Sequence, residues 1–488
     1  MTNLKVYYTY QKFLNELLKN QYNTNISAFQ DIDVEDRYKR LLKSVIKLIK
    51  DNPQASISTL RFQLFKDSGI KELVDNFVKE TKITPSIVLD YGTDRNRETI
   101  LCGLKQEYIY RDGRYNYEPL PIEQDTIFDL ASTSKLFTAL SILKLEEKGL
   151  IDLFEPITKY APEFTNLTDV TVFDLLKFRV AIITDKRVDS AKNKEEAEAI
   201  LRTVHRKDSD NIKNAYTDMG AMVLREVVEK VSKMQFSDFV YEEILKPLKM
   251  EDTYLRVPKE KINRVANENY SSRVDKDGNI ITRYDNYPGT PHDPKAIAIG
   301  VLDGVAPGHA GYFSTRGDML KLGHALIDGT ILPLQSVLSM SDTATGFKDE
   351  NGWARFYGSL VYLKQPNPNN LSVYPLLSGK AFMSPGFAGT TLVVDPLNKL
   401  TLFIGANRLH NRIYEIHPNQ LKYVIKNPIT HKKTYRSPIT GAEKIVCSEY
   451  TGNKEIMVTK ALDLALQLQF LEKLMPKEKE LILVRELN

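Results

Sequence analysis

Apolar residues in the first 80 positions recur at helical spacing among many charged residues. In the clearest piece, Tyr38, Leu42, Val45 and Ile49 form one apolar stripe, opposite a face of lysines. A basic amphipathic helix of this kind lies on a membrane in some proteins, but more often it packs on its own protein with the lysines in water. We therefore expect residues 1–80 to be a helical extension that packs on the rest of the chain.

Four further segments have the pattern of β-strands. Residues 83–91 and 98–108 are rich in β-branched and aromatic side chains, which favours two strands. Residues 353–363 predict another strand, although their alternation is imperfect. Residues 392–404 predict a β-hairpin, because two apolar runs flank an Asp-Pro-Leu-Asn turn.

Helical patterns dominate much of the remaining chain. Residues 145–290 are mainly helix and loop, and residues 457–474 form a last amphipathic helix. We expect this last helix to cover the sheet that the strands form. The chain contains no internal repeats or low-complexity tracts.

Composition and charge narrow the class of protein. The chain has 488 residues, 42% hydrophobic and 27% charged, which is ample for a large core and more than one domain. Its 67 basic and 63 acidic residues give a net charge of +4, too small to indicate nucleic-acid binding. The two cysteines, Cys102 and Cys447, form no disulfide framework, and we expect free thiols.

The N-terminus lacks the apolar stretch of a secretory signal. No run of about 18 apolar residues occurs, so we expect no membrane span. Both features predict a cytoplasmic protein and argue against cell-wall peptidoglycan as the substrate. The sequence does not indicate an oligomeric state.

Candidate chemistry begins with one tetrapeptide. Ser132 precedes Lys135 by three positions at the start of a helix-forming run, so both side chains lie on one face a turn apart. The lysine amine can accept the hydroxyl proton, and N–H groups at a helix N-terminus stabilise the negative charge that develops beside it. This is the chemistry of an activated serine nucleophile. Alone the pattern is weak, because many such spacings are exposed helix surface.

The sequence around the tetrapeptide carries a family resemblance. The run 128–164 continues through a Gly-Leu-Ile-Asp-Leu turn (149–153) and ends in a Pro-Glu-Phe segment (162–164). It resembles the serine β-lactamase-related family, which includes class C β-lactamases, penicillin-binding DD-peptidases and acyl esterases. The resemblance extends over roughly residues 84–410 and recurs in several separate blocks.

The resemblance implies an α/β fold of the α+β type, the β-lactamase/transpeptidase-like fold, with an antiparallel sheet flanked by helices. We expect a hydrolase domain at residues 81–475, with an all-helical lobe inserted at about 145–290. Residues 1–80 then form an N-terminal helical extension, and residues 476–488 a C-terminal tail.

A second block, Tyr216-Thr217-Asp218, resembles the family's Tyr-x-Asn element, whose tyrosine points at the nucleophile. A phenol beside an ammonium group can relay protons between the serine and the leaving group. Asp218 replaces the usual amide with a carboxylate, which favours a charged Lys135 and shifts more of the base role to Tyr216. An acidic site also suits anionic substrates such as penicillins poorly. The alternative is a loop tyrosine that precedes a buried helix.

A third block departs further from the family. Aligning Gly386 with the glycine of the family's Lys-Thr-Gly or His-x-Gly strand puts Ser384 where a lysine or histidine normally binds a substrate carboxylate. Lys380 is about 13 Å away along a strand and cannot substitute for it. The resemblance still implies an oxyanion hole formed by the backbone N–H groups of Ser132 and Phe387. Ser384 and Gly386 remain candidate substrate-binding residues.

Other positions leave alternatives open. Phe178-Arg179-Val180-Ala181 replaces the family's His-Thr-Ser-Gly. Arg179 can supply the missing cation and bind an acidic acyl group, although a surface arginine paired with an acid is the simpler interpretation. His292 and His309 are expected to be structural, because no cluster of metal-ligand spacing surrounds them.

The sequence therefore predicts a serine hydrolase that acts through an acyl-enzyme on a small-molecule carboxylic ester or small amide. Ser132 attacks the acyl carbonyl, Lys135 accepts its proton, and Tyr216 relays that proton to the leaving group. This chemistry requires no metal or organic cofactor. Two alternatives remain: a β-lactamase or D-Ala-D-Ala-type peptidase with the same residues, and a catalytically silent binding protein of the same fold.

Overall fold

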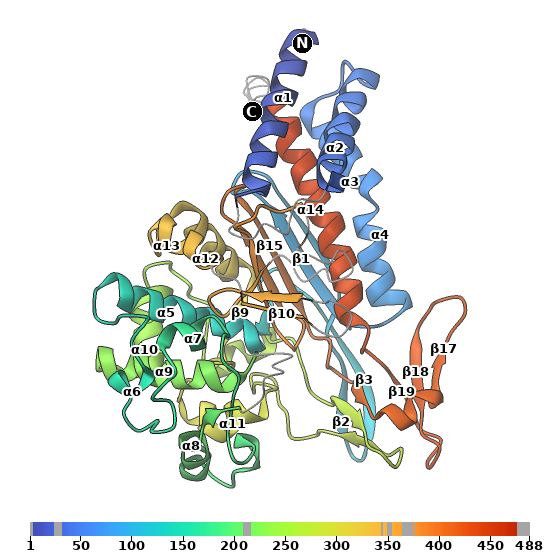
Figure 1. Ribbon diagram of the computed structural model, residues 1–488. Coiled ribbons are helices and arrows are strands. Elements are labelled where there is room, and N and C mark those ends of the chain that lie inside the picture. Colours follow the sequence, from blue (N-terminus) through green and yellow to red (C-terminus); the bar gives the residue numbers. More distant parts are fainter. Residues whose placement is uncertain are drawn as a thin grey trace.

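The computed structural model describes residues 3–23, 32–207, 216–342, 345–348, 354–363, 374 and 376–475. Its main element is a nine-stranded antiparallel sheet (Figure 1). The strands are β1 (Ser86–Gly92), β2 (Arg97–Arg111), β3 (Arg114–Pro121), β10 (Thr345–Lys348), β11 (Ala354–Tyr357), β12 (Tyr362–Leu363), β13 (Phe382–Pro385), β14 (Thr391–Asp395) and β15 (Leu400–Ala406). Their order across the sheet is β10-β11-β12-β13-β14-β15-β1-β2-β3.

The centre of the sheet is covered on both faces. All residues of β1 and β15 are buried, and Val88 pairs with Gly405 in their antiparallel register. Strands buried on both faces read as continuous apolar runs, which is why residues 83–91 and 400–404 were recognisable.

Helices from both ends of the chain cover one face of the sheet (Figure 1). They are α1 (Asn3–Gln21), α2 (Ile32–Asp51), α3 (Ile57–Ser68), α4 (Ile70–Asp75) with its π-helical continuation (Asn76–Glu80), and α14 (Tyr450–Leu474). Tyr38, Leu42 and Val45 of α2 are buried in the same hydrophobic cluster as α14 and the sheet. The expectation that this amphipathic helix packs on its own protein is confirmed.

The opposite face of the sheet carries the second cluster of helices (Figure 1). They are α5 (Lys135–Glu147), α6 (Ile157–Tyr160), α7 (Val172–Leu176), α8 (Lys194–Arg202), α9 (Asp218–Ser232), α10 (Phe236–Val240), α11 (Pro294–Ile299), α12 (Arg316–Asp328) and α13 (Leu334–Ser339). Helix α12 packs directly on β14 and β15, and α5 packs on α9. The predicted lobe at 145–290 is mainly helical, with the short pair β5 (Ile182–Ile183) and β6 (His205–Arg206) inside it.

Three smaller sheets complete the fold. The pair β4 (Ile127–Asp129) and β9 (Phe313–Thr315) lies directly before the candidate nucleophile. The other two sheets are β16 (Ile413–Ile416), β7 (Ser272–Val274) and β8 (Ile280–Thr282), and β17 (Val424–Lys426), β18 (Lys433–Arg436) and β19 (Glu443–Ile445).

Two predicted elements have different bounds. Residues 353–363 form two strands, β11 and β12, separated by a turn in which Leu360 has a φ of 54°, and Trp353 lies outside the described residues. The last helix was predicted from residue 457 but begins at Tyr450. The predicted tail at 476–488 also lies outside the described residues.

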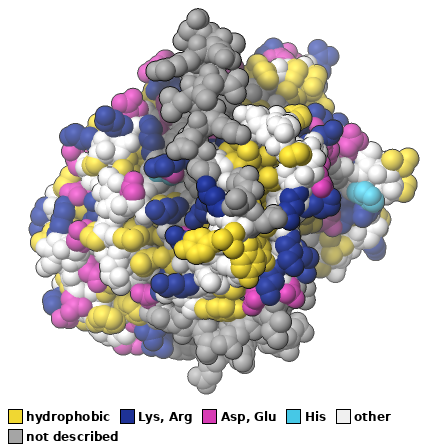
Figure 2. All heavy atoms as spheres, turned by 90° about the horizontal axis from the view of Figure 1, so that it is seen from above, with side chains coloured by type: hydrophobic (Ala, Val, Ile, Leu, Met, Phe, Trp, Pro, Cys, Tyr) yellow, Lys and Arg dark blue, Asp and Glu magenta, His cyan; other side chains and the backbone are white. Residues whose placement is uncertain are grey.

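Basic and acidic side chains are interspersed over the face seen in Figure 2, in keeping with a net charge of +4. Over the described ranges, every helix is too short or too polar to cross a lipid bilayer.

Candidate active site

The chain turns sharply between β4 and the first helical turn that carries Ser132. Ala131, at the turn, has a φ of 44°, a left-handed conformation that costs an alanine free energy. The carboxylate of Asp129 accepts hydrogen bonds from the N–H groups of Ala131 and His292, both at 2.8 Å. One buried carboxylate therefore holds the strained turn and ties it to the loop that contains His292.

Ser132 and Lys135 lie as the sequence predicted. The Lys135 Nζ donates to the Ser132 Oγ at 2.9 Å, to a carboxylate oxygen of Asp218 at 2.7 Å and to the carbonyl of His309 at 3.2 Å. The lysine side chain is only 1% exposed. Its position at the start of α5 points the ammonium group at the hydroxyl of the preceding turn.

The charge state of Lys135 is set by its neighbours. Burial disfavours the ammonium form, but the Asp218 carboxylate and a hydrogen bond with Tyr216 outweigh it and raise the pKa of Lys135. Burial likewise opposes ionisation of Asp218, yet Lys135, and then His309 and Lys295, hold the pKa of Asp218 well below its usual value. The resting site therefore contains an ion pair, and Lys135 is a donor to Ser132.

Tyr216 completes the group around the lysine. The Lys135 Nζ lies 5.0 Å from the centroid of the Tyr216 ring. The ring of Phe178 stacks on the ring of Tyr216, with the two centroids 5.0 Å apart and an interplanar angle of 30°. The segment that replaces the family's His-Thr-Ser-Gly thus places an aromatic ring against Tyr216.

Strand β13 forms the wall opposite the lobe. The carbonyl of Ser384 accepts a hydrogen bond from the Thr133 Oγ1 at 3.1 Å, which ties the strand to the nucleophile turn. A Cβ at Gly386 would lie 2.3 Å from the Thr390 Oγ1 and 2.4 Å from the Leu130 carbonyl. Only glycine fits this approach.

The N–H of Phe387 follows directly, and it has no hydrogen-bond partner in the part of the chain that the structure describes. A free backbone donor at this position is what the predicted oxyanion hole requires from its second residue.

A cavity of about 730 Å³ joins these groups. Ser132, Tyr216 and Asp218 line one side of it, and Gly386 and Phe387 line the strand side. Such a volume suits a small organic substrate.

Three other predicted or considered positions lie elsewhere. Arg179 forms an ion pair with Asp174 at 3.6 Å and has a half-exposed side chain. Ser384 is 2% exposed, and its neighbours along the strand, Met383 and Pro385, line the cavity. Lys380 forms an ion pair with Asp342.

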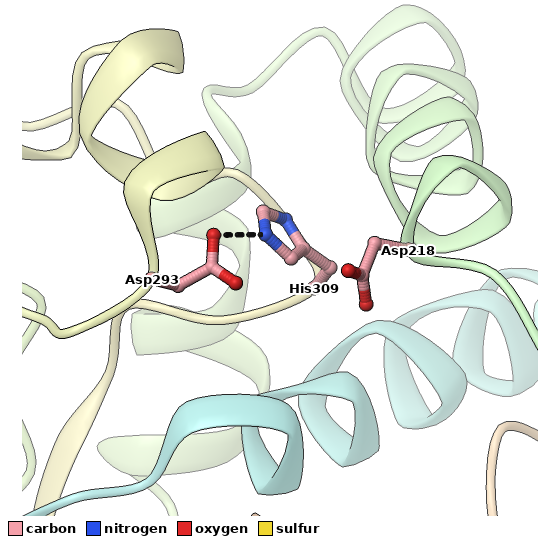
Figure 3. A group of neighbouring side chains, drawn as sticks. All are labelled: Asp218, Asp293 and His309. Atoms are coloured by element: carbon pink, nitrogen blue, oxygen red, sulfur yellow. Dashed lines mark hydrogen bonds and ion pairs between the residues drawn. The ribbon is translucent and has the colours of Figure 1, made fainter. Parts of the chain in front are cut away.

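A second layer of charge behind Asp218 had no assigned role in the sequence. The Lys295 Nζ lies 3.2 Å from Asp218 and 3.6 Å from Asp293. The His309 Nε2 lies 3.0 Å from the Asp293 carboxylate, and Asp218 lies beside the two (Figure 3). Lys295 lies at the start of α11, and its two carboxylate partners are close to it only in the folded chain.

Asp218, Asp293 and His309 bring one potential metal-ligand atom each within 4.8 Å of one another. Lys135 and Lys295 already pair with Asp218, and Lys295 also pairs with Asp293. Two cations at this distance from the acids oppose a third, so the donor set suits a network of ion pairs better than a metal centre.

The comparisons with known proteins agree on one family. A family model described as Beta-lactamase matches residues 106–421. An N-acetylmuramyl-L-alanine amidase of Bacillus subtilis (strain 168) is 24% identical over 382 residues, which cover 70% of this chain and 83% of the relative. A putative D-alanyl-D-alanine carboxypeptidase of Escherichia coli (strain K12) is 25% identical over 336 residues, which cover 62% of this chain and 74% of the relative.

Among solved structures, the D-amino acid amidase from Ochrobactrum anthropi SV3 resembles this chain with a TM-score of 0.54 at 19% sequence identity. The match covers 82% of this chain and 97% of the amidase. At this identity the likeness concerns the fold.

Proposed function

The chain belongs to the beta-lactamase family of serine acyl-enzyme hydrolases, and we propose that it is an esterase-like member that cleaves a carboxylic ester or a small amide. The predicted β-lactamase/transpeptidase-like fold is confirmed. The observation that carries the proposal is the contact of 2.9 Å between Ser132 and Lys135, at a cavity that Phe387 also lines.

In the proposed reaction, the Ser132 Oγ attacks the acyl carbonyl and forms a tetrahedral intermediate. The N–H groups of Ser132 and Phe387 stabilise its oxyanion. Collapse of the intermediate breaks the bond to the leaving group, which departs with a proton, and leaves the acyl group on Ser132. Water then attacks this ester and releases the acid.

The proton from Ser132 needs an acceptor. Lys135 donates to Ser132 and is paired with Asp218, so it cannot accept a proton while it is charged. We therefore assign the base to the Lys135–Tyr216 pair in the form that has lost one proton. Tyr216 lines the cavity and can pass the proton to the leaving group, which supports the shift of the base role towards the tyrosine.

Esters and small amides are favoured over β-lactams by two features. Ser384 stands where the family has a lysine or histidine for the substrate carboxylate, and its side chain is buried. Asp218 adds negative charge beside the nucleophile.

The second candidate is an amidase or D-alanyl-D-alanine-type peptidase with the same residues. The printed names of the relatives, which are an amidase and a putative carboxypeptidase, favour it. A cytoplasmic location remains our expectation, and cell fractionation tests whether cell-wall peptides are within the reach of the protein.

The test is the intact mass of the wild-type protein and of Ser132→Ala after incubation with a fluorophosphonate. A single adduct that the variant lacks supports an activated Ser132. A panel of aryl esters, amino-acid amides, a D-Ala-D-Ala peptide and a chromogenic β-lactam then separates the candidates. No adduct on folded wild-type protein would favour the catalytically silent binding protein.

A further inference from the structure

The cavity has a second wall that the proposed reaction does not use. Beyond Phe387 it is lined by Arg408, which follows β15, and by the first turn of α14, including Tyr450 and Lys454. Arg408 and Lys454 are only 7% and 6% exposed. Two nearly buried cations therefore face the same cavity as the nucleophile.

Arg408 is held in a fixed orientation. Its Nε donates to the carbonyl of Phe387 at 2.5 Å, and its guanidinium carbon lies 4.5 Å from the centroid of the Phe387 ring and 5.6 Å from that of Tyr450. The remaining guanidinium nitrogens have no partner among the described residues. Stacked rings orient a guanidinium group and leave its edge free for an acceptor.

Lys454 is equally poor in acidic partners. Its Nζ donates to the hydroxyl of Thr391 at 3.1 Å, and within the described chain neither this lysine nor Arg408 forms an ion pair. Cations on the lobe side of the cavity are different: Arg187 pairs with Asp189 at 2.7 Å, and Lys295 pairs with Asp218. Burying a charge without a counter-charge costs free energy, so the burial of Arg408 and Lys454 without acidic partners requires a physical explanation.

Two acids act on this pair at longer range. Glu268 is buried, and burial, followed by the charge of Asp129, raises its pKa well above the usual value. Burial also raises the pKa of Glu455, which lines the cavity next to Lys454.

The start of α14 adds positive potential at the same wall. Thr451 and Gly452 are exposed residues that line the cavity, and their N–H groups have no hydrogen-bond partner within the described residues. The first turn contains no acidic side chain. A helix of 25 residues presents a partial positive charge at this end.

We propose that Arg408, Lys454 and the first turn of α14 form an anion-binding subsite, which takes a carboxylate or phosphate group on the substrate of the proposed reaction. The subsite replaces the cation that is missing at Ser384, but from another part of the chain. Because Arg408 also holds the Phe387 carbonyl, an anion bound there fixes the loop that supplies the oxyanion-hole N–H. The inference rests on the proposed function for its substrate, but its binding test does not need turnover.

The test measures equilibrium binding to the Ser132→Ala protein by calorimetry. The probes are hippurate, its neutral counterpart benzoylglycinamide, and phenyl phosphate. We expect the better of the two anions to bind about tenfold more tightly than the neutral amide. Tighter binding of hippurate identifies a carboxylate subsite, and tighter binding of phenyl phosphate a phosphate subsite.

Lys454→Met keeps an unbranched apolar side chain, one atom shorter, and removes its charge, so the ratio of anion to amide affinity should fall by about tenfold. Lys444→Met is the matched control, because Lys444 is a half-buried lysine without an acidic partner among the described residues, and its Nζ donates to Tyr270 and Ser272 outside the cavity. It should leave the ratio unchanged.

Equal affinity for anion and amide, or a ratio that Lys454→Met does not change, would overturn the subsite. Absence of all binding to a folded protein would do the same. Fluorophosphonate labelling of wild-type Ser132 is a separate measurement. Labelling without anion binding would contradict the subsite but not the proposed reaction. Anion binding without labelling would contradict the proposed reaction but not the subsite.

Discussion

Asp218 holds the ammonium group of Lys135 at 2.7 Å, at a site where the lysine is almost excluded from solvent. The pKa of Lys135 is higher in the folded protein than in the unfolded chain, so its charge stabilises the fold at a pH below the unfolded-state pKa. This stabilisation is lost as the pH rises through the folded-state pKa. The pKa of Asp218 is lower in the folded protein, so its carboxylate stabilises the fold at a pH above the unfolded-state pKa. This stabilisation is lost as the pH falls through the folded-state pKa. The ion pair is therefore intact across the neutral range.

Asp218→Asn should move the rising limb of the pH profile of kcat/KM to lower pH. Without the carboxylate, the effect of burial on the pKa of Lys135 is less strongly opposed, so Lys135 loses its proton more readily. We expect a shift of about one pH unit or more, measured with an aryl ester between acid and alkaline limits.

Asp277→Asn is the control for this profile, because Asp277 is an exposed turn residue. A profile of Asp218→Asn that coincides with wild type, or moves to higher pH, would show that Asp218 does not set the protonation of Lys135.

Phe178→Leu should lower kcat more than it changes KM. Phe178 is buried and stacks on Tyr216, so its loss frees the tyrosine ring to leave the position from which it transfers the proton. We expect a loss of about tenfold in kcat, because small displacements of a reacting group are costly. Steady-state kinetics on one ester measures both constants.

Phe13→Leu is the matched control, since Phe13 is also buried and stacks on the buried Phe470, with the two centroids 5.5 Å apart, away from the cavity that Ser132 lines. If the two variants lower kcat equally, Phe178 contributes only to the packing of the protein and does not position Tyr216.

Gly386→Ala tests the close approach of β13 to the nucleophile turn. The new Cβ would meet the Leu130 carbonyl at 2.4 Å, and backbone at this distance must move. We expect the free energy of unfolding to fall by about 1–3 kcal/mol. The rate of fluorophosphonate labelling should fall by about a hundredfold, because the oxyanion donor of Phe387 shifts with the strand.

Gly317→Ala provides the comparison, because the nearest atom to its added Cβ is 3.8 Å away. If Gly386→Ala labels as fast as Gly317→Ala, the strand is not held at the distance that the proposed oxyanion hole requires.

The parts of the site that could be predicted from the sequence depend on residues that are close together along the chain. Ser132 and Lys135 lie within one helical turn, so their contact follows from helix geometry alone. The central strands were recognisable from their apolar runs, and the Tyr216 block from its resemblance to a family element. Lys295 was visible in the sequence, but its two carboxylate partners come from separate elements and meet it only in the folded lobe.

The second wall of the cavity was missed for a specific reason. The last helix was predicted to begin at residue 457, because Gly452 and the polar residues around it have weak helix propensity and no apolar periodicity. In the structure the hydroxyl of Tyr450 donates to the carbonyl of Gly389 at 2.8 Å, and this tertiary contact supports an earlier start. The first turn of α14 thereby reaches the cavity, which Lys454 and Arg408 both line.

Lys454→Met should stabilise the free protein at neutral pH. Burial, followed by the charge of Arg408, lowers the pKa of Lys454 from 10.5 to about 8. Between these values the unfolded chain binds more protons than the folded one, so wild-type stability rises with pH across this window and is lowest below it. The variant lacks this penalty, so its midpoint of thermal unfolding should exceed that of wild type near neutral pH and approach it at strongly alkaline pH.

Lys444→Met separates this effect from anion binding. Burial lowers the pKa of Lys444 to about 7, so its replacement should produce the same trend in stability with pH. Saturating hippurate or phenyl phosphate should raise the thermal midpoint of wild type and of Lys444→Met, because a ligand that binds the folded state stabilises it, but should raise that of Lys454→Met much less. If both lysine variants respond to the anion like wild type, the cost of burying Lys454 has another cause than the anion subsite.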